Sequence, residues 1–443
     1  MESNLADLPE DIVRGIADRV APECRPRMRA ICSAFSAAVP AEPQPWIVLQ
    51  PDDDIAERDQ QSGSFSVMSL PANRKLRLSR PCSIPGARCL GAGHGWLALV
   101  GGDLSVTLHN PLSDRSVSLP PLTRHPMVGG VRDDGRVLWR SWLGVWPNSG
   151  DLVAAEELRD TFVRKIVFSP RPDQDGYFAV AISDRRSYAM YARAGSTAWR
   201  TLRDAHGHPV SLVHDVVHVE GSRFFAVTRC HGKVLALDLA VQAGVGAGGD
   251  HDADQDHQAA QGGVDDDSGG EEEDVHDRYS PSVSVFAGPL ALAETIGYFS
   301  RGTDMHVENH VVLVDGELHQ IWASWVIEPA PEEDDSDGDY RIEEVGVVKC
   351  DLDQCACWAE VADLGDWAVL VGRNETVAVR AGDVPGVRGS CVYFIDNRLK
   401  EMICAFDTRS GRVETVECDM LRDACSTSRL SSPPPMWLLP SLK

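Results

Sequence analysis

The chain has 443 residues, enough for more than one domain and for a large buried core. Its formal net charge is −25, but segments 249–278 and 328–344 hold 21 of the 67 acidic residues, so the remainder is only mildly acidic. The sequence has no basic stripe, so we expect no nucleic-acid partner. It has no run of about eighteen apolar residues, so we expect no membrane-spanning helix.

The twelve cysteines are scattered and sparse for this length. This usage is typical of reduced thiols and not of a secreted disulfide scaffold. The first residues contain acids and a proline where a signal peptide would need basic residues and an apolar run. We therefore expect the protein in the cytoplasm or the nucleus.

Residues 1–45 predict a compact helical module. Asp7 can cap a first helix, and Pro9 is tolerated in its opening turn. Ile12, Ile16 and Val20 recur four residues apart and so share one face. After two prolines, a second helical stretch carries on one side Met28, Ile31, Cys32 and Phe35. A module this small cannot bury a self-sufficient core, so it is expected to lean on a partner.

These residues resemble an F-box. That family combines a Leu-Pro pair, acids, a helix with aliphatic residues four apart, and an apolar-Cys pair before an aromatic residue, present here as Leu8-Pro9, Glu10-Asp11, Ile12/Ile16/Val20, Ile31-Cys32 and Phe35. The resemblance implies docking on a Skp-family adaptor, and through it on a cullin, by way of Leu8, Pro9, Ile12, Ile16, Val20, Ile31, Cys32 and Phe35. The alternative is a helical cap on the domain that follows.

A proline- and acid-punctuated connector is expected over residues 46–78. From Ser79 the pattern changes to short, Val-rich runs separated by turn residues, which indicates an antiparallel all-β fold. At about 40 to 50 residues per four-stranded blade, this length corresponds to six to eight propeller blades, with two tandem sandwiches as the alternative. The predicted fold class is thus α+β multidomain, a small N-terminal helical module followed by an all-β propeller over 79–443, with Trp437 on the closing blade.

The β-region also resembles a known family. Gly91–Leu97, Leu108–Leu112 and Leu119-Pro120 look like the start of the KIB-type β-propeller of many plant F-box proteins, the domain of unknown function 295 family. Later landmarks of that family correspond to Val163–Ser169, Trp199-Arg200, Asp215–Val217, Val392–Phe394 and Pro433–Leu438. The resemblance implies that the propeller holds a substrate protein for ubiquitination.

Two acidic insertions interrupt the β-pattern, at about 244–278 and 328–344. The first contains Gly, Asp, Glu, Gln and His but few large apolar residues, so it cannot offset its ordering entropy and is expected to be disordered. The second is expected to be a shorter version inside a hairpin. It comes close to the spacing of an EF-hand loop, but prolines precede it where a helix should enter, so a solvated acidic loop is the preferred interpretation.

Three further clusters invite a chemical role. Cys350, Cys355 and Cys357 have no second pair of ligands at a zinc spacing. The histidines at 206, 208, 214 and 218 accompany no nucleophile elbow. Gly91–Gly95 lacks the Lys-Ser/Thr of a phosphate loop, and its glycines more simply allow a tight turn. We therefore expect no metal, no cofactor and no catalytic residue.

Aromatic residues are the remaining candidates for substrate binding. Trp139, Trp142 and Trp146 lie in a turn-rich stretch, where some could anchor a partner, although core packing is expected for at least two of them. The resulting prediction is a non-catalytic substrate adaptor of an SCF-type (Skp–cullin–F-box) ubiquitin ligase. Its rivals are a non-ligase interaction scaffold and a propeller enzyme. Carboxylates or histidines converging on one channel mouth would favour the enzyme.

Overall fold

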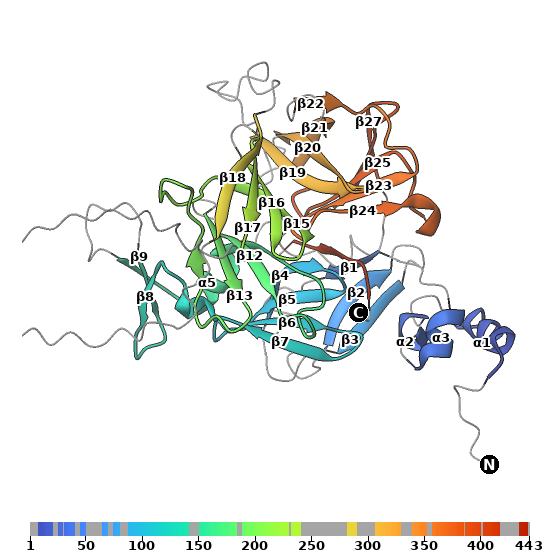
Figure 1. Cartoon of the computed structure of the whole chain (residues 1–443), viewed down its shortest axis with the longest axis horizontal. Helices are drawn as coiled ribbons and strands as arrows, with labels where there is room; N and C mark the ends of the chain where they lie inside the picture. Colours follow the sequence, from blue (N-terminus) through green and yellow to red (C-terminus); the bar gives the residue numbers. More distant parts are fainter. Residues whose placement is uncertain are drawn as a thin grey trace, which may run out of the picture.

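The computed structural model describes residues 8–20, 25–29, 31–39, 45–49, 64–69, 74–79, 87–140, 150–183, 188–229, 232–240, 281–289, 306–328, 339–351, 357–384, 386–399, 402–416 and 434–441 (Figure 1). Strands predominate among these residues, as predicted for a mostly β chain. No helix in these ranges is long and apolar enough to cross a membrane.

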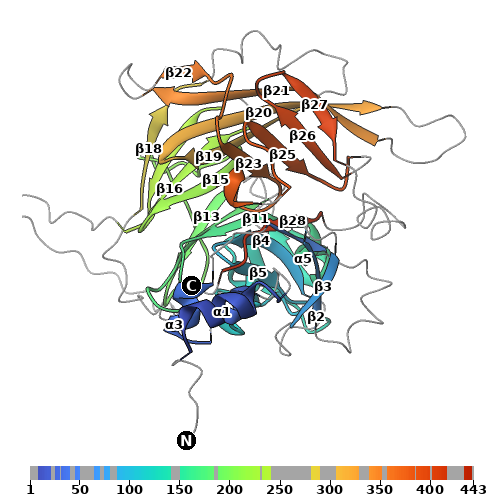
Figure 2. The ribbon, with the colours of Figure 1, turned by 90° about the vertical axis from the view of Figure 1, so that its right-hand side faces the viewer.

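The N-terminal helices are α1 (Glu10–Ala17), α2 (Arg25–Arg29) and α3 (Ser33–Ala38). Val13 and Ala17 lie one turn apart on α1 and pack with Met28 and Phe35 into a cluster made of this module alone. Helix α1 begins directly after Pro9, where the missing proline N–H leaves no helical hydrogen bond unmade. The helices lie to one side of the sheets (Figures 1 and 2).

The described strands form seven sheets, of which six, numbered here in chain order, make up the body of the molecule. Sheet 1 contains β28 (Met436–Leu438), β1 (Trp46–Leu49), β2 (Ser64–Ser69) and β3 (Arg74–Ser79). Sheet 2 contains β4 (Arg88–Gly93), β5 (Trp96–Val100), β6 (Val106–Asn110) and β7 (Arg115–Leu119). Sheet 3 contains β11 (Val163–Phe168), β12 (Phe178–Ser183), β13 (Ala189–Arg193) and β14 (Arg200–Thr201).

The second half of the chain continues this pattern. Sheet 4 contains β15 (Val213–Glu220), β16 (Arg223–Thr228), β17 (Val234–Asp238) and β18 (Ser282–Ala287). Sheet 5 contains β19 (His306–Val314), β20 (Glu317–Glu328), β21 (Asp339–Asp351) and β22 (Cys357–Glu360). Sheet 6 contains β24 (Val377–Arg380), β23 (Trp367–Val371), β25 (Cys391–Ile395), β26 (Ile403–Asp407) and β27 (Arg412–Thr415). The β23–β25 pairing is parallel, and the other pairings are antiparallel.

Hydrophobic clusters join these six sheets into a ring. Sheets 1 and 2 share one cluster, sheets 2 and 3 the next, and so on until the cluster between sheets 6 and 1 closes the circle. Strands β28, β4 and β11 lie near the middle of the molecule in Figure 2. Radial packing of this kind buries both faces of each sheet between its neighbours, which suits Val-rich strands.

The C-terminus closes the ring. Strand β28 pairs with β1 in sheet 1, so the two ends of the β-region form one sheet. Trp437 is fully buried against sheet 6, where its indole N–H donates to the carbonyl of Val371 at 3.0 Å. The prediction that Trp437 lies on the closing blade is confirmed.

A small additional sheet, the outlying sheet, is formed by residues that lie between sheets 2 and 3 in the sequence, although sheets 2 and 3 are direct neighbours in the structure. It consists of β10 (Gly150–Val153), β9 (Val137–Arg140) and β8 (Val128–Val131), and is followed by α5 (Ala155–Thr161). Strands β4 and β11 contact each other directly, so this sheet stands outside the ring, at the left of Figure 1.

Two predicted boundaries are wrong. The connector expected over 46–78 contains β1, β2 and β3, because the prolines and acids that suggested a connector fall between these strands in the sequence and not within them. The acidic insertion expected over 328–344 is shorter, since β20 and β21 pair out to Glu328 and Asp339. The expected hairpin around it is confirmed. The insertion expected at 244–278 lies outside the described residues.

Candidate functional site

The residues predicted to dock an adaptor divide between the surface and the core of the helical module. Pro9, Ile12, Ile16 and Ile31 are exposed. Leu8, Val20 and Cys32 are partly buried against the module's own hydrophobic cluster, and Phe35 is fully inside it. Val20 follows the end of α1, so the expected helical stripe is limited to Ile12 and Ile16.

Trp139 is not an exposed anchor. Its side chain is only 5% exposed and packs on Phe162 and His125, at 4.2 and 5.9 Å between ring centroids. It is therefore a core residue of the outlying sheet, and its candidacy for substrate binding was wrong. Trp142 and Trp146 lie outside the described residues.

The cysteine and glycine candidates have structural roles. Cys350 is buried at a sheet interface and Cys357 is exposed at the end of β22, while Cys355 lies outside the described residues. Among the described residues, no three His, Cys, Asp or Glu side chains are grouped to hold a metal ion. Gly95 turns the chain at φ +85°, whereas Gly91 allows a close approach of β11 and Gly93 lies against the side chain of Glu375.

The four clustered histidines separate. His206 and His208 are exposed in a turn around Asp204. His214 and His218 are buried on β15, the first strand of sheet 4, which lies at the edge of that sheet nearest the middle of the ring. There they join residues from sheets 3 and 5 and from the loop 372–376 between β23 and β24. We call Lys165, Asp215, His310, Glu375 and Thr376 the inner-strand cluster.

Asp215 is the centre of this cluster. Its Oδ1 accepts a hydrogen bond from Nζ of Lys165 at 2.5 Å, and its Oδ2 accepts one from the hydroxyl of Thr376 at 2.8 Å. Nδ1 of His310 lies 3.3 Å from the same Oδ2. Burial alone would raise the pKa of Asp215, but the charge of Lys165 and the bond from His310 lower it, so the carboxylate is ionised.

Glu375 ties a second set of strands to the same place. One carboxylate oxygen accepts the backbone N–H of His218 at 2.8 Å, and the other lies 3.3 Å from Nε2 of His94. A Cβ on Gly93 would stand 2.8 Å from that second oxygen, so a larger residue there would displace the Glu375 carboxylate. Burial would lower the pKa of His94, but the charge of Glu375 raises it.

A third carboxylate, Glu308 on β19, is held by an arginine. Nη2 of Arg398 lies 2.9 Å from Glu308 and 2.9 Å from Asp396. The Arg398 guanidinium also stacks over Trp325, 4.7 Å from the ring centroid. Planar stacking and bidentate bonding fix Arg398 in one orientation.

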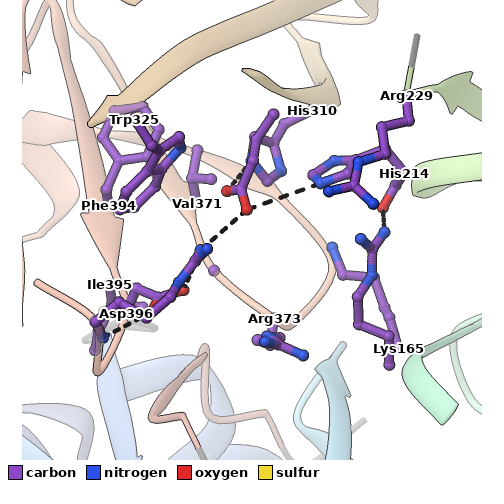
Figure 3. Close-up of a pocket in the computed structure, with 14 residues that line it drawn as sticks. Lys165, His214, Arg229, His310, Trp325, Val371, Arg373, Phe394, Ile395 and Asp396 are labelled. Atoms are coloured by element: carbon purple, nitrogen blue, oxygen red, sulfur yellow. Dashed lines mark hydrogen bonds and ion pairs between the residues drawn. The ribbon is translucent and has the colours of Figure 1, made fainter. Parts of the chain in front are cut away.

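Lys165, Glu308 and Arg398 border a pocket of about 160 Å³ (Figure 3). His214 and His310 stand in its wall with their rings 5.2 Å apart and nearly perpendicular. Burial and the nearby Arg164 cation lower the pKa of His214 well below its usual value, so this imidazole is neutral. Burial opposes protonation of His310, but Asp215 and Glu308 outweigh it and raise the pKa of His310.

The carboxylates at this site are all paired. Among the described residues, each carboxylate of the site is matched by a cation or a backbone N–H, whereas the neutral imidazole of His214 carries no charge. Carboxylates and histidines do converge at the inner strand ends, the arrangement that sequence analysis associated with a propeller enzyme.

Among the residues of this site, His214 and His218 were considered from the sequence, whereas Lys165, Asp215 and Glu375 were not predicted as site residues. Lys165 and Asp215 lie within the strands Val163–Phe168 and Val213–Glu220, where charged residues interrupt a valine-containing, mostly buried run. A buried strand contains a charge only when a partner meets it, so this interruption was the available signal.

Comparison with known proteins completes the description. The family model described as the KIB1-4 beta-propeller matches residues 67–407. Among solved structures, apo AztD from Citrobacter koseri is similar at 9% identity over 84% of this chain and 93% of that chain, with a TM-score of 0.26, too low to carry an argument. No curated protein matches the chain. Because the family model covers more than half of the sequence, the chain belongs to the KIB1-4 β-propeller family.

Proposed function

We propose that this protein is a substrate-recognition adaptor of an SCF-type E3 ubiquitin ligase. A β-propeller domain suggests a protein-interaction role, and the F-box-like N-terminal sequence supports docking on a Skp-family adaptor and through it on a cullin. The propeller would hold a substrate protein near a ubiquitin-conjugating enzyme, so the mechanism is proximity and the chain itself is non-catalytic. The expected compartment is the cytoplasm or the nucleus.

Exposed aliphatic residues on the helical module carry this proposal. Ile12, Ile16 and Ile31 are 48%, 37% and 49% exposed, while Val13 and Ala17 fill the module's own core. Ile12 and Ile16 stand four residues apart and therefore share one outer face of α1. An apolar outer face beside a complete small core is what a docking helix requires.

The test is capture of a purified Skp-family adaptor by the full chain. We compare wild type with Ile12→Ser/Ile16→Ser, because these side chains face outward and their loss should leave the fold intact. Leu8 is a poorer choice, since it packs against the module core. Val285→Ser, an equally exposed aliphatic change on β18, serves as the matched control.

The proposal predicts capture by wild type and by Val285→Ser, with at least tenfold weaker capture by the double variant, about 1.4 kcal/mol or more. Equal capture by all three proteins would place the contact elsewhere. Absence of capture by folded wild type would overturn the ligase role and favour a scaffold whose helices merely cap the propeller.

A propeller enzyme is the second candidate, because Asp215, Glu308 and Glu375 lie with four histidines at the inner strand ends. The fixed pairing of the carboxylates supports an ordered framework instead. The enzyme reading predicts that replacement of His214 or His310 abolishes a turnover reaction while partner binding persists. Loss of partner binding without any turnover in wild type would support the adaptor reading.

A further inference from the structure

The pocket at the inner strand ends contains an excess of positive charge. Its walls include Arg164, Arg229, Arg373 and Arg398 against the carboxylates of Glu308 and Asp396. Lys165 also borders the pocket, but its positive charge is compensated by Asp215, which does not line the pocket. Four guanidinium groups against two carboxylates give this pocket a charge of about +2, within a chain of net charge −25.

Two of these arginines have no counter-ion among the residues that the structure describes. Arg398 is committed to Glu308 and Asp396, and Arg164 donates to the backbone carbonyl of His214. The side chains of Arg229 and Arg373, in contrast, form no ion pair or hydrogen bond within the part of the chain that the structure describes. Figure 3 shows Arg229 above and Arg373 below, on different sides of the pocket.

A buried imidazole offers a third, unused polar group. His310 is 5% exposed, and its Nε2 has no hydrogen-bond partner among the described residues. Because Nδ1 of His310 faces the ionised Asp215, the proton belongs on Nδ1, and a second proton would make Nε2 a donor toward the pocket. Glu308 Oε2 is 3.8 Å from Nε2, beyond hydrogen-bond distance.

The size of the pocket limits the ligand. At about 160 Å³ it compares with a cavity of roughly 150 Å³ that holds benzene, and it is smaller than the roughly 300 to 1,000 Å³ of drug-sized sites. A phosphate group and the first atoms of its ester fit this volume. Phosphate carries a charge of about −1.5 to −2, which matches the excess, and guanidinium groups bind it in a bidentate manner.

We propose that this pocket binds a phosphate monoester group, with Arg229 and Arg373 as its principal ligands. The group belongs either to a small molecule or to a phosphorylated side chain of a partner. The inference concerns the propeller alone and does not rest on docking of the helical module, so either proposal can fail without the other.

The experiment is calorimetric titration of the full chain at fixed salt with inorganic phosphate and with N-acetyl-phosphoserine amide. N-acetyl-serine amide is the uncharged control ligand. The variants are Arg373→Gln, Arg229→Gln and the double variant, with Arg412→Gln on β27, exposed and outside the pocket, as the matched control. Arg229 is itself exposed, so its replacement should preserve the fold.

We expect wild type and Arg412→Gln to bind a phosphate ligand, each single variant to bind about tenfold more weakly, and the double variant to bind not at all. Equal affinity for both phosphate ligands would indicate a free phosphate compound, whereas preference for the phosphoserine derivative would indicate a partner's side chain. No binding by wild type at millimolar concentrations, or undiminished binding by the double variant, overturns the proposal.

Discussion

Nζ of Lys165 lies 2.5 Å from Oδ1 of Asp215, and the two side chains are only 4% and 0% exposed. The pair links sheet 3 to sheet 4 at the inner ends of β11 and β15. Asp215 is also bound by Thr376 from the loop after β23 and by His310 from β19. One carboxylate therefore holds together four segments that are far apart in the sequence.

Removing the cation of this pair should be costly. Lys165→Met leaves Asp215 buried without its counter-charge, so we expect a loss of about 3 to 5 kcal/mol in the free energy of unfolding at neutral pH, measured by urea titration. The pKa of Asp215 should rise in the variant because burial is no longer opposed by Lys165. Since protonation then removes the buried charge, the deficit relative to wild type should shrink as pH falls.

Lys349→Met provides the matched control. Lys349 lies 2.6 Å from Glu317, but both side chains are substantially exposed, so this change should cost less than about 1 kcal/mol. Similar losses for the two lysines, or a deficit that does not depend on pH, would contradict a structural role for the Lys165–Asp215 pair.

Sequence patterns predicted the Val-rich strands and the propeller, but not strand β4. Val- or Phe-rich runs of the kind expected after Ser79 form strands such as β11 (Val163–Phe168) and β16 (Arg223–Thr228). Strand β4 was missed because its sequence, Arg-Cys-Leu-Gly-Ala-Gly, has low strand propensity. Its glycines are required by tertiary contact, since a Cβ on Gly91 would stand 2.0 Å from the carbonyl oxygen of Ile166.

The pocket could not be predicted from the sequence because it also depends on tertiary contacts. Its charged residues come from separate sheets, and only the closed ring brings them together. A local motif cannot contain this information.

The F-box-like pattern was visible because its residues are close in the sequence, but the pattern did not show that Phe35 faces inward while Ile12 faces outward.

The contact between Gly91 and Ile166 leads to a second prediction. Gly91→Ala should lower the free energy of unfolding by about 1 to 3 kcal/mol, because the new Cβ must displace the backbone of β11. Gly102→Ala is the control, since nothing lies within 4 Å of the added atom, and should change stability by less than about 0.5 kcal/mol. If both variants unfold like wild type, β4 and β11 are not neighbours in the ring.

Ring closure through Trp437 gives a third prediction. Trp437→Ala removes a fully buried indole and its bond to Val371, so we expect a loss of about 3 to 5 kcal/mol. Trp437→Phe retains most of the packing but leaves the Val371 carbonyl without its donor, and should cost about 1 to 3 kcal/mol. Guanidinium unfolding of the three proteins checks this order, and a phenylalanine variant as unstable as the alanine variant would contradict it.

Buried His125 predicts a loss of stability in acid. Burial lowers the pKa of His125 to about 3, whereas the unfolded chain binds this proton below about pH 6.5. Between these values only the unfolded state is protonated, so the free energy of unfolding falls on acidification, by at most about 1.4 kcal/mol per pH unit from this residue. The N–H of Met127 donates to Nδ1 of His125 at 3.0 Å, so Nδ1 is the acceptor at neutral pH.

His125→Asn isolates this contribution, because asparagine can still accept the Met127 bond but cannot be protonated in this range. Urea unfolding at pH 6.5 and pH 5.0 should show a loss on acidification that is smaller than in wild type by about 1.6 kcal/mol. His206→Asn, in the exposed 204–208 turn, should retain the wild-type dependence. An unchanged pH dependence in His125→Asn would mean that the folded protein accepts a proton at this ring, and the aromatic packing around Trp139 would then have to open near pH 6.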